Sequence, residues 1–298
     1  MAFELARVLP PVVVPPLKSA RSRLHLGRHD LGLGRPWDKS YLLRRDAYVA
    51  RVLDDQELVD AIARGARLPA RHGVGIDERS VELPWLLAQR LERFPRFLDA
   101  GSSLNHQFLL DRFELPREMH VMTLAPEREC FWTRGISYLF ADLRDIPVRD
   151  GFYDAIACIS TLEHVGLDTT LFAGAPAAPR QSDEGMLAVM RELARVLRPG
   201  GHLYLTVPFG KRRTFSWLRQ LDAALLDEVL SAFGPCSERS ERYFRYSPSG
   251  WQVAQRAECA DSEFVEWLAA RDWPRSIPLE PDLAAAARAV ACITLVKG

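Results

Sequence analysis

Four carboxylates follow four apolar runs of this 298-residue sequence, each at a distance of zero to a few positions: Asp99, Glu127, Asp142 and Glu163. If the runs are parallel strands, their carboxyl ends meet at one edge of the sheet, where open α/β sheets bind ligands. A carboxylate there can accept hydrogen bonds from a sugar diol or an amine. Any one of these acids could instead cap a helix or be solvated, which is the commoner role. Four acids in equivalent places favour a shared crevice.

The first of these turns reads Asp99, Ala100, Gly101, Ser102, Ser103, Leu104, Asn105. Gly101 has no side chain to block a ligand that approaches the backbone, and the serines and the asparagine add short polar groups before a helix. Only one glycine is present, so the G-x-G-x-x-G spacing that seats a dinucleotide pyrophosphate is missing. The segment predicts a ligand without that phosphate group, or a strand-to-helix turn that binds nothing.

The later turns offer complementary groups. Glu127 follows the second run and is placed to accept two hydrogen bonds from a ribose diol, and Asp142 follows the third and could accept from an adenine amine. The fourth run opens into Ser160, Thr161 and Glu163. That turn lies beside the first one if the strand order reverses between them.

The elements that must position these residues are short apolar runs that alternate with amphipathic stretches. Such alternation predicts a doubly wound α/β domain with a mostly parallel sheet. Helical spacing of apolar residues predicts helices at 46–66, 80–91 and 184–197, the last of which ends at Arg198-Pro199-Gly200-Gly201. We expect strands at 96–100, 120–124, 138–141, 153–160, 202–207 and 289–296.

The chain divides by composition into a Pro- and Arg-rich, partly helical extension over residues 1–75 and a main domain over 76–298, with insertions on the acceptor side near 209–270. Lys plus Arg equals Asp plus Glu at 39 each, which argues against a nucleic-acid partner. Five widely spaced cysteines show no zinc-ligand pair, so we expect reduced thiols and no metal. The N-terminus lacks signal-peptide features and no run is long enough to cross a membrane, so we expect a cytoplasmic protein.

The order of these segments resembles that of the class I S-adenosylmethionine-dependent methyltransferases from Arg96 onward. LDAGSSLN resembles their cofactor loop, Glu127 their ribose acid, Ala141-Asp142-Leu143 their adenine-side segment, and ARVLRPGGHLYLTVP their helix, turn and fifth strand. Within this class, GIDERSVELPWLL, ISTLEHVGLD and ARAVACITLVK resemble a bacterial group associated with cell-surface glycan or secondary-metabolite genes. The loop departs from the commoner D-x-G-x-G-x-G by having Ser103 and Asn105 at the later glycine positions.

The resemblance implies a Rossmann-like fold with a seven-stranded sheet, S-adenosyl-L-methionine as the cofactor, and a set of cofactor-binding residues. That set is Asp99, Gly101, Ser102, Ser103, Asn105, Glu127, Asp142, Leu143, Ser160, Thr161 and Glu163.

Methyl transfer from a sulfonium is an in-line displacement, so alignment of the acceptor supplies most of the catalysis; effective molarities of about 10⁵ M or more are available from orientation alone. A base helps when the acceptor is a hydroxyl or a protonated amine. His164 is our preferred candidate for that base and Asp168 the second, because both lie just beyond the fourth strand. A histidine at a strand edge can instead bond to the backbone or cap the cofactor.

The acceptor must bind outside the cofactor half of the sheet, where basic and aromatic residues mix. Lys211, Arg212 and Arg213 could hold a carboxylate, phosphate or nucleotide-sugar group, with Tyr243 and Trp251 excluding water. We therefore expect methylation of a small-molecule or glycan-linked acceptor, at oxygen before nitrogen. The alternative is a non-catalytic cofactor-binding partner or scaffold in a biosynthetic complex. The oligomeric state, monomer or homodimer, stays open.

Overall fold

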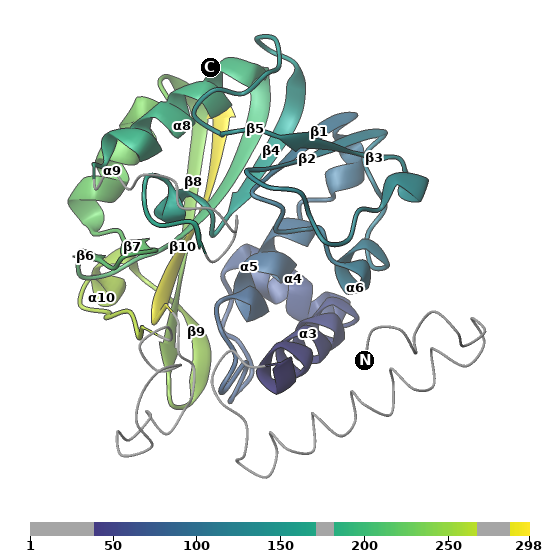
Figure 1. The fold of residues 1–298 in the computed structure, drawn as a ribbon. Coiled ribbons are helices and arrows are strands. Elements are labelled where there is room, and N and C mark those ends of the chain that lie inside the picture. The colour runs from purple at the N-terminus through teal and green to yellow at the C-terminus, as the bar shows by residue number, and fades with distance from the viewer. Residues whose placement is uncertain (1–38, 171–181, 267–286) are drawn as a thin grey trace, which may run out of the picture.

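A computed structural model describes residues 39–170, 182–266 and 287–298 of the chain. Its centre is an eight-stranded sheet in the order β3-β2-β1-β4-β5-β10-β8-β9 (Figure 1). The strands are β1 (Arg96–Ala100), β2 (Glu118–Thr123), β3 (Ile136–Phe140), β4 (Tyr153–Ile159), β5 (Leu197–Pro208), β8 (Cys236–Ser247), β9 (Gly250–Ala254) and β10 (Ala289–Lys297). A separate two-stranded hairpin joins β6 (Arg213–Thr214) to β7 (Arg219–Gln220).

The five strands β3, β2, β1, β4 and β5 are parallel to one another. The order in which the chain adds strands reverses at β1, since β2 and β3 lie on one side of it and β4 and β5 on the other. Strand β10 is antiparallel to both of its neighbours, β5 and β8, and is inserted between them. The doubly wound, mostly parallel fold is thus confirmed. The expected number of seven strands was wrong, because β9 folds back on β8 through a hairpin and adds an eighth.

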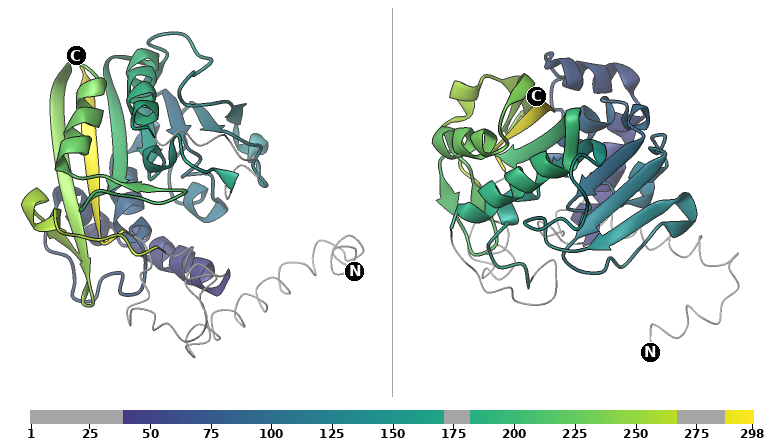
Figure 2. Two further views of the ribbon diagram at one scale, coloured as in Figure 1. Left: turned by 60° about the vertical axis from the view of Figure 1, so that its left-hand side comes forward. Right: turned by 90° about the horizontal axis from the view of Figure 1, so that it is seen from above.

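Helices cover both faces of this sheet (Figure 2). Helices α8 (Glu184–Val196) and α9 (Ala223–Ala232) pack on one face, and α3 (Lys39–Leu53), α4 (Gln56–Arg64) and α5 (Arg79–Leu87) pack on the other. Residues along β4 alternate between the two cores: Ile156 and Cys158 contact the α8 side, and Ala155 and Ala157 contact the α3 to α5 side. A strand covered on both faces reads as a continuous apolar run, which is why β4 is visible in the sequence.

Short elements complete the chain. They are the helices α6 (Gln107–Leu110) and α10 (Arg256–Cys259) and the 3-10 turns η1 (Leu91–Arg93), η2 (Trp132–Arg134) and η3 (Leu162–His164). None of the helices in the described ranges has the length and apolar character needed to cross a bilayer.

The predicted helix at 46–66 is two helices, α3 and α4, with a break at Asp54 and Asp55. The Asp55 side chain accepts a hydrogen bond from the Leu58 backbone N–H at 3.1 Å, so it caps a new helix rather than continuing the old one. Val49 and Val52 of α3 and Ile62 of α4 are buried in the same core as the sheet. The division of the chain at residue 75 stays a prediction.

Helix α5 contains Pro84 in its interior, where proline cannot donate the usual bond to the carbonyl of Ser80. His72 Nε2 takes that place and donates to the Ser80 oxygen at 3.2 Å. Its Nδ1 then accepts from the Tyr48 hydroxyl at 3.1 Å. Burial lowers the pKa of His72, which favours this neutral form. The replacement bond lets a proline-bearing helix pack against the sheet.

Candidate active site

The loop after β1 is shaped by Asp99, which is fully buried. Its two carboxylate oxygens accept hydrogen bonds from the backbone N–H groups of Ser103 at 3.1 Å and Leu104 at 2.8 Å. Burial nevertheless raises the pKa of Asp99 to about 7, against the opposing effect of these two bonds. The acid therefore holds the loop and also carries an ionisation near neutrality.

Gly101 occupies a position that no other residue type fits. Its φ is +112°, and a Cβ there would lie 2.0 Å from Thr161 Oγ1. The next residue, Ser102, also has a positive φ, +64°. Ser102 Oγ is buried and, among the described residues, has no hydrogen-bond partner. A donor and acceptor left unsatisfied beside a glycine fits a ligand that approaches the backbone here.

The loop after β4 meets the loop after β1 at one carbonyl. The oxygen of Ile159 accepts hydrogen bonds from Ser103 Oγ at 2.6 Å and from Thr161 Oγ1 at 3.0 Å. Ser160, between them, has a φ of +42°, which is strained for a residue with a side chain. The structure thus brings the predicted residues of β1 and β4 together through hydrogen bonds. We call the edge of the sheet formed by the carboxyl ends of β1, β2, β3 and β4 and the loops that follow them the rim.

Glu163 lies in this rim, in η3, and is 2% exposed. Its Oε2 is buried and lacks a hydrogen-bond partner in the described part of the chain. Burial raises the pKa of Glu163 to about 8, and the neighbouring carboxylate of Glu82 raises it further, whereas Arg79 opposes the rise. A buried carboxyl group with one unsatisfied oxygen and a pKa raised toward physiological pH is characteristic of functional sites.

The two predicted bases have different surroundings. His164 Nδ1 donates to the Trp217 carbonyl at 2.7 Å, and the imidazole stacks on the Trp217 ring at 5.5 Å. Burial lowers the pKa of His164 to about 4, so the ring is neutral at physiological pH. Asp168 accepts from the Thr170 backbone N–H and hydroxyl, and these bonds lower its pKa. His164 is therefore held in place by Trp217 but is a weak base, and the Asp168 carboxylate is hydrogen-bonded to its neighbour Thr170.

The residues after β2 and β3 are more exposed. Asn105 donates to the Glu129 carbonyl at 3.0 Å and accepts from the Tyr138 hydroxyl at 2.7 Å, which ties the β1 loop to this side. Glu127 is partly exposed, close enough to Asp99 that its charge contributes to the raised pKa of that acid.

Asp142 forms a two-pronged pair with the guanidinium of its neighbour Arg144, at 2.6 Å and 3.0 Å. Burial alone would raise the pKa of Asp142, but hydrogen bonds from Arg144 outweigh it and lower the pKa. The side chain of Leu143 packs into the core on the α8 side of the sheet.

Sequence reasoning missed two large apolar side chains on this side. Leu124, just after β2, is 49% exposed and Phe140, at the end of β3, is 43% exposed. Thr123 and Phe140 are register partners, so both apolar groups lie at the same end of adjacent strands. Their position after two neighbouring strands was the available signal. They give this part of the rim an apolar surface suited to a flat base.

The predicted acceptor residues fall into two groups. Lys211 pairs with Glu263 at 2.7 Å, Arg212 pairs with Asp183, and Arg213 is exposed over the Phe215 ring. All three follow the carboxyl end of β5. Tyr243 and Trp251, by contrast, are buried in the cores, where the Tyr243 hydroxyl bonds to Glu241 and the Trp251 indole N–H donates to the Ile76 carbonyl at 2.9 Å. The structure does not bring these two aromatic residues to the rim.

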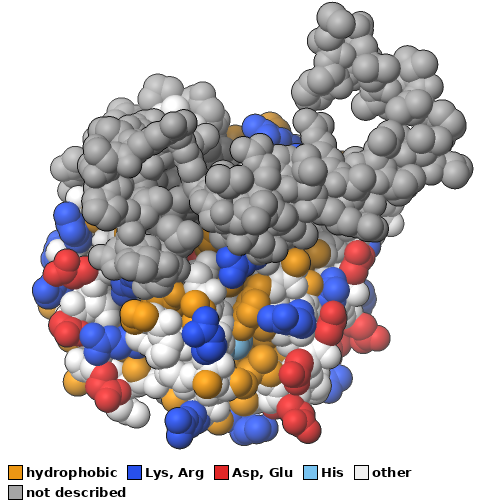
Figure 3. All heavy atoms as spheres, turned by 90° about the horizontal axis from the view of Figure 1, so that it is seen from below, with side chains coloured by type: hydrophobic (Ala, Val, Ile, Leu, Met, Phe, Trp, Pro, Cys, Tyr) orange, Lys and Arg blue, Asp and Glu red, His pale blue; other side chains and the backbone are white. Residues whose placement is uncertain are grey.

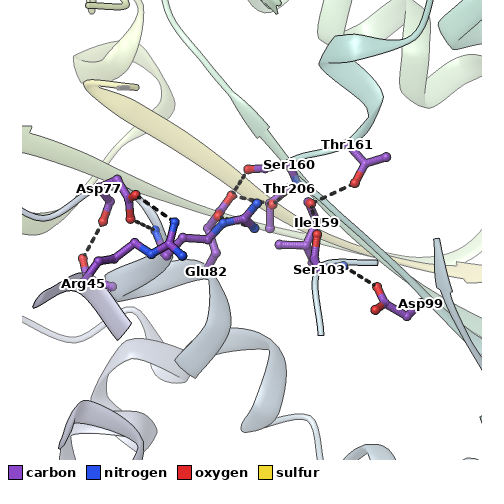
Figure 4. A network of polar contacts seen from close by, with 11 residues as sticks. Arg45, Asp77, Glu82, Asp99, Ser103, Ile159, Ser160, Thr161 and Thr206 are labelled. Atoms are coloured by element: carbon purple, nitrogen blue, oxygen red, sulfur yellow. Dashed lines mark hydrogen bonds and ion pairs between the residues drawn. The ribbon is translucent and has the colours of Figure 1, made fainter. Parts of the chain in front are cut away.

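A polar network from α3 and α5 also reaches the site (Figure 4). Glu82 is fully buried and accepts from the hydroxyls of Ser160 and Thr206. Arg79 and the Arg45–Asp77 ion pair continue the network away from the sheet. Sequence reasoning missed these residues, although a glutamate inside the apolar stretch VELPWLL was a signal.

The residues present fit S-adenosylmethionine. The close approach at Gly101 and the unsatisfied oxygens of Ser102 and Glu163 are grouped at the ends of β1 and β4. The apolar surface of Leu124 and Phe140 lies at the ends of β2 and β3. In the described ranges, no three His, Cys, Asp or Glu side chains gather as a metal site would require.

Comparison with known proteins yields one family. Residues 115–205, from just before β2 into β5, match the family described as "Methyltransferase domain". No curated protein matches the chain.

Solved structures similar to this chain include three with TM-scores below 0.5. An S-adenosylmethionine-dependent methyltransferase from Thermotoga maritima is 14% identical, with a TM-score of 0.42, and the match covers 85% of this chain and 99% of that chain. The N-methyltransferase NodS from Bradyrhizobium japonicum is 13% identical, with a TM-score of 0.41, covering 72% and 94%. The [4+2]-cyclase SpnF is 21% identical, with a TM-score of 0.43, covering 84% and 94%.

At these TM-scores the structural likenesses carry no argument. The strand order and the family match are independent of them. On that basis, residues 115–205 are similar to methyltransferase domains.

Proposed function

We propose that this protein methylates an oxygen atom of a small-molecule or glycan-linked acceptor by in-line displacement. The observation that carries the proposal is the buried Oε2 of Glu163, which has no hydrogen-bond partner among the described residues and lies two positions after Thr161, the residue against Gly101. An oxygen acceptor must lose a proton, and a group that titrates near pH 8 is suited to receive it.

The cofactor contacts proposed from the sequence fall into three parts of the rim. The β1 loop contributes Asp99, Gly101, Ser102, Ser103 and Asn105; the β2 and β3 ends contribute Glu127, Asp142 and Leu143; the β4 loop contributes Ser160, Thr161 and Glu163. Bound S-adenosylmethionine supplies an electrophilic methyl group on a sulfonium. The chain itself has to bind this cation, which buried carboxylates at Asp99 and Glu163 favour.

The proton of the acceptor hydroxyl goes, in this proposal, to Glu163 in preference to His164. Both groups are in η3, but the pKa of Glu163 is about 8 whereas that of His164 is about 4. Base strength near the working pH favours the carboxylate. His164 then serves to shape the acceptor side, through its bond to Trp217. Asp168, farther along the loop, is the remaining candidate base.

Basic residues beyond β5 support an acidic acceptor. Arg212 and the buried Arg219 both pair with Asp183, so two guanidinium groups share one carboxylate there. Arg219 Nη1 has no hydrogen-bond partner within the described ranges. Lys211 and Arg213 lie on the same segment. A carboxylate or phosphate on the acceptor would satisfy this excess of positive charge.

The described part of the face in Figure 3 gives no support to a nucleic-acid acceptor. On the described part of the face in Figure 3, basic side chains are interspersed with apolar and acidic ones. The equal numbers of basic and acidic residues in the chain agree with that distribution.

A thermal-shift experiment tests the cofactor half of the proposal. S-adenosylhomocysteine should raise the melting temperature, whereas NAD and ATP should not, because a ligand that binds only the folded state stabilises it. Methyl label from S-adenosylmethionine should then pass to an acid-extractable small molecule or glycan fraction and be stable to base, as an ether is. Stabilisation by NAD alone, or label on nitrogen, would contradict the proposal.

A non-catalytic cofactor-binding partner is the second candidate, and the pairing of Asp142 with Arg144 favours it, because that acid is engaged without a ligand. Stoichiometric capture of one partner protein, with no methyl transfer to any fraction of an extract, would support this alternative over the first.

A further inference from the structure

Glu82 of α5 is a charged group buried beside the carboxyl ends of two strands. Its Oε1 accepts from Ser160 Oγ at 2.5 Å and from Thr206 Oγ1 at 2.6 Å, and its Oε2 faces Arg79 Nη1 at 3.3 Å. The side chain is fully buried. Burying a carboxylate is unfavourable unless hydrogen bonds and a cation offset the lost hydration, and all three partners do so here.

The two hydroxyl partners hold a strained turn. Ser160 has a φ of +42°, and its backbone N–H donates to the carbonyl and the hydroxyl of Thr206 at 3.1 Å and 3.0 Å. The bond from Ser160 Oγ to Glu82 closes this arrangement on the side of α5. Backbone strain of this kind persists only where the surroundings enforce it. Glu82 is the enforcing group that comes from outside the sheet.

The Ser160 turn determines the positions of the groups on either side. Thr161 follows it and lies against Gly101, and Ile159 precedes it and accepts from Ser103 Oγ. Figure 4 shows these residues as one continuous series that runs from Arg45 on α3 through Glu82 to Asp99. A change at Glu82 therefore reaches both loops of the rim.

Charge gives a second route from Glu82 to the rim. Among the described residues, the charged groups that act on Glu163 are Glu82 and Arg79, both on α5. The titratable neighbour on β4 is Cys158, whose thiol pKa is raised by burial and by the charge of Glu163. Glu82 makes the ionisation of Glu163 less favourable and Arg79 makes it more favourable. Loss of the Glu82 charge alone should leave Glu163 the stronger acid.

We propose that Glu82 is a positioning residue for methyl transfer, which from a helix outside the sheet holds the Ser160 turn and sets Thr161 and Glu163 against the loop after β1. This inference rests on the proposed function. The helices α3 to α5 then contribute to the geometry of the active site, besides covering one face of the sheet.

The test compares Glu82→Gln with Glu57→Gln, a control on the exposed surface of α4. Affinity for S-adenosylmethionine is measured by calorimetry from pH 6.5 to 9, with the melting temperature of each variant. Glu82→Gln should weaken binding by about tenfold or more, because a neutral amide holds the Ser160 and Thr206 hydroxyls less strongly than a carboxylate does. It should also move the pH midpoint of binding lower by about half a unit or more, because Glu163 loses a negative neighbour. The control should change neither.

The outcomes separate the inference from the proposed function. Failure of the unaltered protein to bind S-adenosylmethionine would overturn the proposed function. Binding by Glu82→Gln with unchanged affinity and an unchanged pH midpoint would overturn this inference, and so would a lower melting temperature with both binding parameters intact.

If Glu82→Gln does not fold, Thr206→Val takes its place. Thr206 is not among the proposed cofactor contacts, and valine keeps its branched shape while it removes the hydroxyl that donates to Glu82 and accepts from the Ser160 N–H. Weakened binding supports the role of Glu82, and affinity equal to that of the unaltered protein overturns it.

Discussion

The two halves of the rim differ in how their acids are held. At the ends of β1 and β4, Asp99 and Glu163 are buried, and burial raises the pKa of each. At the ends of β2 and β3, Glu127 and Asp142 are partly exposed, and the pKa of Asp142 is lowered by Arg144. In the first half burial disfavours the charged form of both acids, whereas in the second half Asp142 is already paired with Arg144.

This difference indicates a division of labour. Charges that are costly without a ligand are stabilised by a cation, and the sulfonium of the methyl donor is one. Surface acids beside exposed apolar groups, as at Leu124 and Phe140, suit the uncharged adenosine end. The β1 and β4 half should therefore control catalysis, and the β2 and β3 half should contribute affinity alone.

The largest effect is expected from Gly101→Ala. A methyl group 2.0 Å from Thr161 Oγ1 must displace the β4 loop, so binding of S-adenosylhomocysteine should weaken by about 100-fold. The matched control is Gly135→Ala, where φ is +80° but no atom lies within 4 Å. It should lower the free energy of unfolding by only about 1 kcal/mol and leave binding intact. If both variants bind S-adenosylhomocysteine equally well, Gly101 does not line the cofactor site.

Glu163→Gln should reduce the rate of methyl transfer by about 10²-fold to 10⁴-fold, the usual contribution of a general base. Binding of S-adenosylhomocysteine, which has no sulfonium, should change far less. His164→Asn is the comparison, and we expect a smaller loss of rate because the pKa of His164 is about 4. A greater loss of rate in His164→Asn than in Glu163→Gln would show that His164, and not Glu163, accepts the proton.

The stability of the ligand-free protein should fall as pH rises from about 6.5 to 8. Glu163 has a folded-state pKa of about 8, above its ordinary value, so over this range the folded state binds more protons than the unfolded state. Integrating one such group over this window gives a loss of about 2 kcal/mol. Thermal melts of the unaltered protein and Glu163→Gln would measure it. Parallel pH profiles for the two proteins would contradict the raised pKa.

Asp142→Asn should have the smallest effect. Its pair with Arg144 is partly exposed and worth about 0.5 kcal/mol in stability. We expect S-adenosylhomocysteine to bind no more than about fivefold more weakly, equivalent to about 1 kcal/mol. A loss of affinity as large as that of Gly101→Ala would show that Asp142 leaves Arg144 and binds the cofactor. The two halves of the rim would then no longer differ in this respect.

The centre of the parallel part of the fold was predictable because β1 and β4 are buried on both faces. The sequence 155–159 is entirely apolar, and its neighbours β1 and β5 contain shorter apolar stretches. Strand β8 was missed because CSERSERYFRYS is polar over most of its length and only Tyr243, Phe244 and Tyr246 are buried. A strand that gains its apolar contacts at one end has no periodic signature to detect.

The site was predictable to the extent that topology alone positions it. Asp99 and Glu163 follow strands, so their place at the rim follows from the strand order. Glu82 reaches Ser160 across 78 residues of sequence, and this contact depends on how α5 packs against β4. Trp251 shows the converse: an aromatic residue near basic ones is compatible with a pocket or with the core. Its full burial and its hydrogen bond to the Ile76 carbonyl place it in the core.

The place of β10 affects how the protein is made. Residues 289–297 lie between β5 and β8, pairing with both. Before residues 289–297 are synthesised, the sheet lacks the strand between β5 and β8, and β8 has no partner on that side. Closure of the core between β5 and β8 must wait until β10 emerges, so apolar surface on these strands stays open to chaperones until then.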